Sequence, residues 1–171
     1  MRAVFHRWWF VVEVLGGHVH RRGLVYLLVG AIGIWFHTNY RFGVNISESL
    51  PHRFFLVVLD ETPTKVGDYV AFEWQRHQFY RPSSVFVKRV GGMAGQTVTV
   101  RERRVFVDGR DMGLAKVESK HGTPLPVIHG GVIPPGQIYA TTPHADSLDS
   151  RYETTGLVVA SRVIGKAYAI F

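Results

Sequence analysis

The feature that most constrains the fold is an uncharged run from residue 23 to residue 40. As an α-helix this run would be ~27 Å long, close to the thickness of a bilayer's hydrocarbon core. Trp35 and Tyr40 lie towards one end of the run and Arg21 and Arg22 precede the other, where membrane interfaces favour such residues. The run predicts a transmembrane helix over residues 23–40, with a buried helix of a soluble core as the alternative.

The charges before this run predict its orientation. Residues 1–22 contain four arginines against the single carboxylate of Glu13. By the positive-inside rule they stay in the cytoplasm, and residues 41–171 lie across the membrane. Residues 8–12 are apolar but too few to span, so we expect them at the cytoplasmic leaflet. A cleavable signal peptide is the alternative, but apolar residues continue through positions 34–36 and favour an uncleaved anchor.

Beyond residue 41 the sequence consists of short β-type runs separated by turn signals. The turn signals are Gly91-Gly92, Asp108-Gly109, Gly130-Gly131 and Pro134-Pro135-Gly136. No helical period of useful length appears here. The predicted fold is therefore a mostly-β domain of about 130 residues behind one N-terminal helix. The predicted strands are residues 54–59, 69–74, 85–90, 97–101, 105–107, 137–141, 157–161 and 164–171.

Composition narrows the chemistry. The chain has no cysteine, which excludes disulfides, thiolate metal sites and a cysteine nucleophile. Its nine histidines are scattered without ligand spacing, so we expect no metal and no cofactor. The net charge of +7 favours an anionic partner. Because the basic residues are not stacked with aromatic residues on one face, a phospholipid bilayer is favoured over nucleic acid.

Three short segments carry candidate functional residues. The first, residues 45–51, follows the predicted membrane helix and contains Ser47 and Ser49 before Pro51. In extended backbone the two hydroxyl groups point the same way, and the proline stiffens the chain behind them. An ordinary polar loop is the alternative for this segment taken alone.

The second segment is the predicted strand of residues 85–90. Strand alternation places Lys88 on the face of Phe86 and Val90, and Arg89 on the opposite face. Apolar neighbours lower the pKa of a lysine, which suits a general base near neutral pH. The alternative is an edge-strand lysine that opposes aggregation.

The third segment is residues 147–152, Ser-Leu-Asp-Ser-Arg-Tyr. Asp149 and Arg151 are two residues apart, so in extended backbone they face the same way and can form an ion pair. Such a pair would fix a loop, and this structural role is compatible with a place in an active site.

Taken together, the segments resemble the type I signal peptidases, whose catalytic centre is a serine–lysine dyad. Residues 49–51 resemble the family's nucleophile box, residues 88–92 its lysine box, and residues 147–152 its Ser-x-Asp-Ser-Arg box. Residues 163–167 resemble its terminal strand. The resemblance implies a domain of twisted antiparallel sheets that form a partial barrel.

Within the family the sequence is most similar to the conjugative-transfer branch, the TraF-like pilin-processing peptidases. Ser49-Leu50-Pro51 with Asn45 upstream matches this branch, whereas general signal peptidases have one more residue before the proline. They also carry a Gly-Asp-Asn motif that this sequence lacks. Residues 52–55 and Gln96 depart from the family pattern, which leaves the width of the substrate cleft open.

The resemblance assigns Ser49 as nucleophile and Lys88 as general base, with Asp149 as a third catalytic residue. We expect the Ser49 hydroxyl to lie ~3 Å from the Lys88 amine. The orienting roles fall to three further residues. The Ser47 hydroxyl would join the Ser49 backbone N–H in stabilising the oxyanion, Ser147 would orient Lys88, and Arg151 would brace the loop with Asp149.

The expected function is that of a membrane-anchored serine endopeptidase that removes a signal or pro-peptide from a secreted or pilin precursor in conjugative transfer. Its partners would be the membrane-bound precursor and the phospholipid bilayer. It would cross the inner membrane once, with the catalytic domain in the periplasm. Hydrolysis and pilin cyclisation are both open outcomes. The alternatives are a general type I signal peptidase and a non-catalytic, membrane-tethered scaffold of a secretion or conjugation apparatus.

Overall fold

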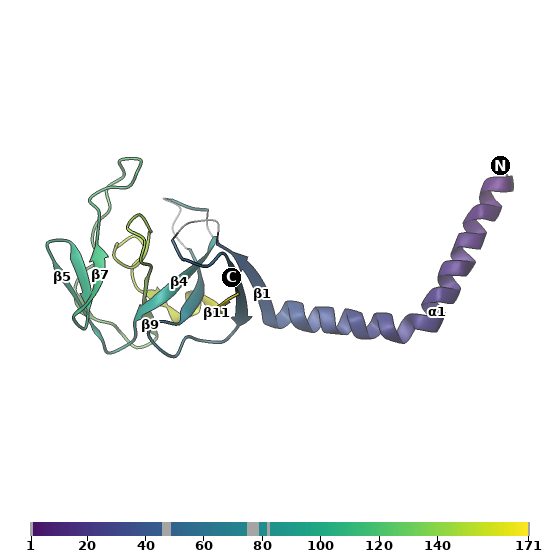
Figure 1. The fold of residues 1–171 in the computed structure, drawn as a ribbon, viewed down its shortest axis with the longest axis horizontal. Coiled ribbons are helices and arrows are strands. Elements are labelled where there is room, and N and C mark those ends of the chain that lie inside the picture. Colours follow the sequence, from purple (N-terminus) through teal and green to yellow (C-terminus); the bar gives the residue numbers. More distant parts are fainter. Residues whose placement is uncertain (1, 46–48, 75–78, 82, 171) are drawn as a thin grey trace. The chain divides into compact units, whose positions relative to one another are not determined.

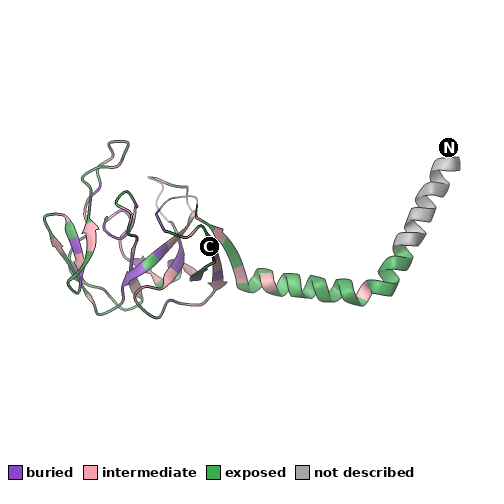
Figure 2. Cartoon of the chain, viewed as in Figure 1, coloured by how far each residue is buried: buried purple, intermediate pink, exposed green. Residues whose placement is uncertain are grey.

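The computed structural model describes residues 2–45, 49–74, 79–81 and 83–170, with side chains from residue 16 onwards. The chain divides into two compact units, Met1–Asn39 and Tyr40–Phe171. The first is a single helix, α1 (Arg2–Asn39), whose Gly16–Asn39 part is long and apolar enough to cross a membrane. None of the described side chains in this part is buried (Figure 2). The helix also takes in residues 8–12, and Tyr40 begins the first strand instead of ending the helix.

The second unit contains a seven-stranded antiparallel sheet (Figure 1). The last strand of the chain lies between two early ones, which joins the C-terminal segment to the start of the domain. In spatial order the strands are β1 (Tyr40–Val44), β2 (Phe54–Leu59), β11 (Val163–Ala169), β3 (Tyr69–Glu73), β4 (Val85–Gly92), β9 (Gln137–Thr141) and β10 (Val158–Val159).

This sheet curls on itself. Three strands separate β1 from β4 in the sheet order, yet a Cβ atom placed on Gly43 of β1 would lie 3.9 Å from Val87 Cγ2 of β4. Alternation gives the sheet two apolar faces. One cluster contains Val70, Phe72 and Val90, and another contains Phe55 and Ala71. The predicted mostly-β fold with antiparallel sheets is confirmed.

A smaller four-stranded sheet lies at the end of this unit remote from β1 (Figure 1). Its β5–β6 hairpin turns on Glu102 and Arg103, which both have positive φ angles, 47° and 66°. Two such residues in a two-residue loop match the twist of the paired strands. The strands in order are β7 (Arg110–Leu114), β6 (Arg104–Val107), β5 (Thr97–Arg101) and β8 (Gly131–Val132).

Three predicted strands, residues 54–59, 97–101 and 137–141, have the observed bounds. β1, β7 and β8 were not predicted, and the strand predicted at 157–161 is β10 followed by a short 3-10 helix, η1 (Ala160–Arg162). The turns predicted at Gly91-Gly92 and Gly130-Gly131 were wrong, because the first pair belongs to β4 and Gly131 begins β8. The first pair is glycine for a packing reason. A Cβ atom on Gly92 would lie 2.8 Å from both Ile133 Cδ1 and Val107 Cγ1.

This packing leads to a stability prediction. Gly92→Ala should lower the free energy of unfolding by about 1–3 kcal/mol, because a methyl group overpacks the contact between the sheets. Denaturant titration of the full chain in detergent, followed by tryptophan fluorescence, measures the change. Ser161 is exposed, so the control variant Ser161→Ala should change the free energy of unfolding by less than about 0.5 kcal/mol. Equal stability of Gly92→Ala and wild type would contradict this account of the two glycines.

Candidate active site

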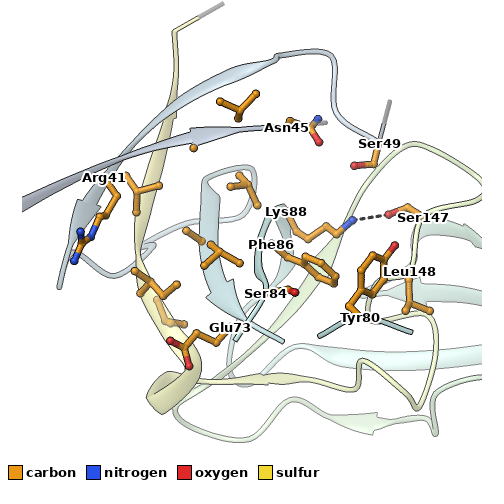
Figure 3. A pocket seen from close by; sticks show the side chains of 18 of the residues that line it. Arg41, Asn45, Ser49, Glu73, Tyr80, Ser84, Phe86, Lys88, Ser147 and Leu148 are labelled. Carbon is orange, nitrogen blue, oxygen red and sulfur yellow. Dashed lines mark hydrogen bonds between the residues drawn. The ribbon is translucent and has the colours of Figure 1, made fainter. Parts of the chain in front are cut away.

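A cleft of about 1130 Å³ opens in the unit of residues 40–171 (Figure 3). Its walls include residues of β1, β2, β3, β4 and β11 and of the loops that follow β1, β3, β7 and β9. Ser49, Lys88 and Ser147 all line it, together with the apolar side chains of Phe86 and Leu148. Residues far apart in the sequence therefore meet in one cavity.

Strand β4 places Lys88 in this cleft. Its cross-strand neighbour is the fully buried Val70, and its Nζ atom lies 5.6 Å from the centre of the Phe86 ring. Lys88 is 7% exposed, whereas Arg89, which points to the other face of the strand, is exposed. A cation is thus held among apolar groups, where water stabilises its charge only weakly.

The Lys88 amine has a defined partner and a lowered pKa. Its Nζ atom donates a hydrogen bond to Ser147 Oγ at 2.6 Å. Burial lowers the pKa of Lys88 to about 8; the charge of Asp149 acts to raise it and that of Arg151 to lower it further. At pH 7 roughly a tenth of the molecules then carry a neutral amine. A neutral lysine has a lone pair that accepts a proton.

Ser49 lies on the loop between β1 and β2 and is 6% exposed. Asn45 closes this loop: its backbone N–H donates to Arg53 O at 2.7 Å, and its side-chain amide donates to His52 O at 3.3 Å. In Figure 3, Ser49 lies at the same end of the cleft as Lys88 and Ser147. Ser47 lies outside the described residues, so its predicted role stays a prediction, as does proton transfer between Ser49 and Lys88.

Asp149 and Arg151 form a buried ion pair beside the turn that carries Ser147. The guanidinium group donates to both carboxylate oxygens, at 2.9 and 3.0 Å, and the two residues are 0% and 2% exposed. Burial acts to lower the pKa of Arg151, but the hydrogen bonds and charge of Asp149 outweigh it and raise the pKa. Arg151 also donates to the carbonyl oxygens of His144 and Ser147, which holds the turn that carries Ser147.

Sequence reasoning missed other members of the site. Tyr80 and Leu148 line the same cleft as Lys88 and provide apolar walls (Figure 3). Thr142 donates its backbone N–H to Asp149, at 3.2 Å. Asp146 lies beside Ser147 and binds two lysines from a distant segment. No local pattern indicates these contacts, since each depends on how separate loops pack. Among the described residues, no group of three or more His, Asp or Glu side chains is arranged to hold a metal ion.

Comparisons with known proteins identify relatives of this chain. The chain is 27% identical over 169 residues to the "Probable conjugal transfer protein TraF" of Sinorhizobium fredii, covering 86% of this chain and 87% of that protein. It is 27% identical over 166 residues to the "Conjugal transfer protein TraF" of Agrobacterium fabrum, covering 87% and 90%. A signal peptidase I crystal structure from Enterococcus faecalis matches 63% of this chain and 98% of that one, at 21% identity and a TM-score of 0.40. Residues 18–171 match the family model described as signal peptidase, peptidase S26, and the chain therefore belongs to that family.

Proposed function

We propose that this protein is a membrane-anchored serine endopeptidase that cleaves a signal or pro-peptide from a secreted or pilin precursor during conjugative transfer. Membership of the signal peptidase family supports peptide-bond cleavage. The names of the two relatives support a role in conjugation. A helix apolar enough to span a bilayer supports action on precursors that are themselves in the membrane.

The observation that carries the proposal is the buried Lys88 amine, with its lowered pKa, in the same cleft as Ser49. Neutral Lys88 removes the proton from the Ser49 hydroxyl as its oxygen attacks the scissile carbonyl carbon. Lys88 then returns this proton to the departing amine. The ester formed on Ser49 carries the segment N-terminal to the scissile bond, and water releases it. Where the removed peptide is the C-terminal one, that segment is the pilin, and its own amino terminus can attack the ester in place of water to give a cyclic product. The Ser49 N–H and the Ser47 hydroxyl are assigned to the oxyanion.

The cleft has the form expected of a site for an extended peptide. β1 stands at the end of the sheet order, and its residues 41–44 line the cleft together with Asn45. A peptide that pairs with such a strand gains affinity from backbone hydrogen bonds, while side-chain pockets select its sequence. We assign this role to β1.

The experiment uses the full-length protein in detergent and three substrates. These are the pilin precursor of its own conjugation system, that precursor with arginine at the scissile position, and a general secretory preprotein. Mass spectrometry should detect a shortened product, or one lighter by a further water if it is cyclic, from the first substrate alone. Cleavage of the preprotein instead would favour a general signal peptidase. Failure to cleave any of them would favour the scaffold and overturn the proposal.

The orientation of the chain has its own test. Because residues 1–22 are basic, they stay in the cytoplasm and the unit of residues 40–171 enters the periplasm. Alkaline phosphatase fused after Phe171 should therefore be active, and β-galactosidase fused at the same point inactive. The reverse pattern would refute the periplasmic location.

A further inference from the structure

Residues 115–125 form a stiff hairpin-like segment after β7, here called the strap. Its two sides are joined by hydrogen bonds from Ser119 N to Thr123 O and from Leu125 N to Val117 O, both 2.8 Å. The Arg103 guanidinium closes its base by donating to three carbonyl oxygens. These belong to Ala115, Lys116 and Leu125. The strap is therefore a fixed element with a defined direction.

Two lysines of the strap bind one carboxylate of the loop that carries Ser147. Lys116 contacts Asp146 Oδ1, and Lys120 Nζ lies 3.1 Å from Asp146 Oδ2. The backbone N–H of Lys116 is itself held by the Tyr152 hydroxyl, at 3.2 Å. Hydrogen bonds from both lysines lower the pKa of Asp146 to about 2. Asp146 therefore stays negatively charged at neutral pH. Lys120 and Asp146 both line the cleft.

Asp146 directly precedes the partner of the Lys88 amine. In this turn Ser147 N donates to His144 O at 3.2 Å, and Asp146 N donates to His144 Nδ1 at 3.1 Å. Arg151 holds the buried side of the turn through the carbonyl oxygens of His144 and Ser147. The strap lysines hold its partly exposed side, where 28% of the Asp146 side chain is accessible.

We propose that Asp146 is a positioning residue that, through Lys116 and Lys120, fixes the Ser147 hydroxyl and thereby the direction of the Lys88 amine. This inference rests on the proposed function, since it assigns Asp146 to the geometry of that same site. Small displacements of a catalytic base lower the rate steeply, so an ion pair of little value to stability can still matter to turnover.

Kinetics on the pilin precursor test the proposal. Asp146→Ala should lower kcat about 10-fold with KM changed less than about 2-fold. The double variant Lys116→Ala/Lys120→Ala should lower kcat to the same extent. The triple variant should lower kcat little further, because all three changes remove the same interaction. A variant with the charges exchanged should recover most of the wild-type kcat. It combines Asp146→Lys with Lys116→Asp and Lys120→Asp. Asp111→Ala, which removes an exposed ion pair with Arg104, is the matched control and should keep wild-type kcat.

Salt offers a second readout. Because the ion pairs are partly exposed, raising the salt concentration to about 1 M screens them. The kcat of wild type should then fall towards that of Asp146→Ala, while the kcat of the variant should stay level. A wild-type kcat in Asp146→Ala, or a charge exchange as slow as the single change, would overturn the proposal.

Hydrogen exchange separates this inference from the proposed function. In the full-length protein, Asp146→Ala should speed amide exchange in residues 144–150, and Asp111→Ala should not. A wild-type protein that cleaves no precursor would refute the proposed function, but exchange would still decide whether the lysines hold the loop. Unchanged exchange in Asp146→Ala would refute the positioning role whatever the cleavage assay gives.

Discussion

Replacing Lys88 with methionine should lower kcat for the pilin precursor by roughly 10³-fold. Methionine keeps the length and apolar body of the side chain but has no basic nitrogen, so the Ser49 hydroxyl keeps its proton. Stability should not fall at neutral pH. Burial lowers the pKa of Lys88 to about 8, which means that the fold disfavours its charged form, and methionine removes that cost. Single-turnover cleavage and denaturant titration of the full chain measure the two effects.

The pH dependence follows from the same pKa. The reactive form of Lys88 is the neutral amine, so kcat/KM should rise with pH through about 8 and level off above it. Below that pH it should fall about tenfold for each unit, because each unit reduces the neutral fraction tenfold. A profile that stays flat between pH 6 and 9 would exclude Lys88 as the base.

Matched variants separate the loss of a catalytic group from disruption of the fold. Ser49→Ala should reduce kcat at least as strongly as Lys88→Met, and the double variant should be no slower than the worse single one, because the two groups act in one step. Lys65→Met and Ser161→Ala change exposed residues outside the cleft and should retain wild-type rates. If Lys88→Met kept more than about a tenth of wild-type kcat, another group would have to be the base.

The environment of Lys88 could be predicted because a strand alternates with a period of two. Once residues 85–90 are taken as a strand, Lys88 must share a face with Phe86 and Val90, and the structure has this arrangement. A short β-type run between turn signals predicted the observed bounds of residues 54–59, and the spacing of Asp149 and Arg151 predicted their ion pair. Each of these inferences needed only neighbouring residues.

The remaining features depend on contacts that no local pattern encodes. Placement of β11 between β2 and β3 brings together residues about a hundred positions apart. The glycines of β4 appear in the sequence as a turn, because the side chains that crowd them, among them Val107, Ile133 and Thr141, come from later parts of the chain. Asp146 meets the strap lysines across some 30 positions. Chain topology, and not propensity, determines all three.

The second large effect concerns stability. Asp149→Ala should lower the free energy of unfolding by about 3–5 kcal/mol, because it leaves the Arg151 guanidinium buried without its carboxylate. Asp149 and Arg151 are 0% and 2% exposed, so water cannot replace the lost partner without a rearrangement. The backbone N–H of Thr142 loses its acceptor as well. Denaturant titration of the full-length protein in detergent measures the loss.

Asp111→Ala provides the contrast, because its ion pair with Arg104 is exposed and should contribute less than about 1 kcal/mol. Asp149→Asn tests the electrostatic part at nearly constant shape. The charge of Asp149 raises the pKa of Lys88 and that of Arg151 lowers it, so neutralising Asp149 should move the rise of kcat/KM to lower pH. If Asp149→Ala were as stable as Asp111→Ala, the buried pair would not be what holds the Ser147 turn. A shift of the profile to higher pH would contradict the assigned direction of its effect on Lys88.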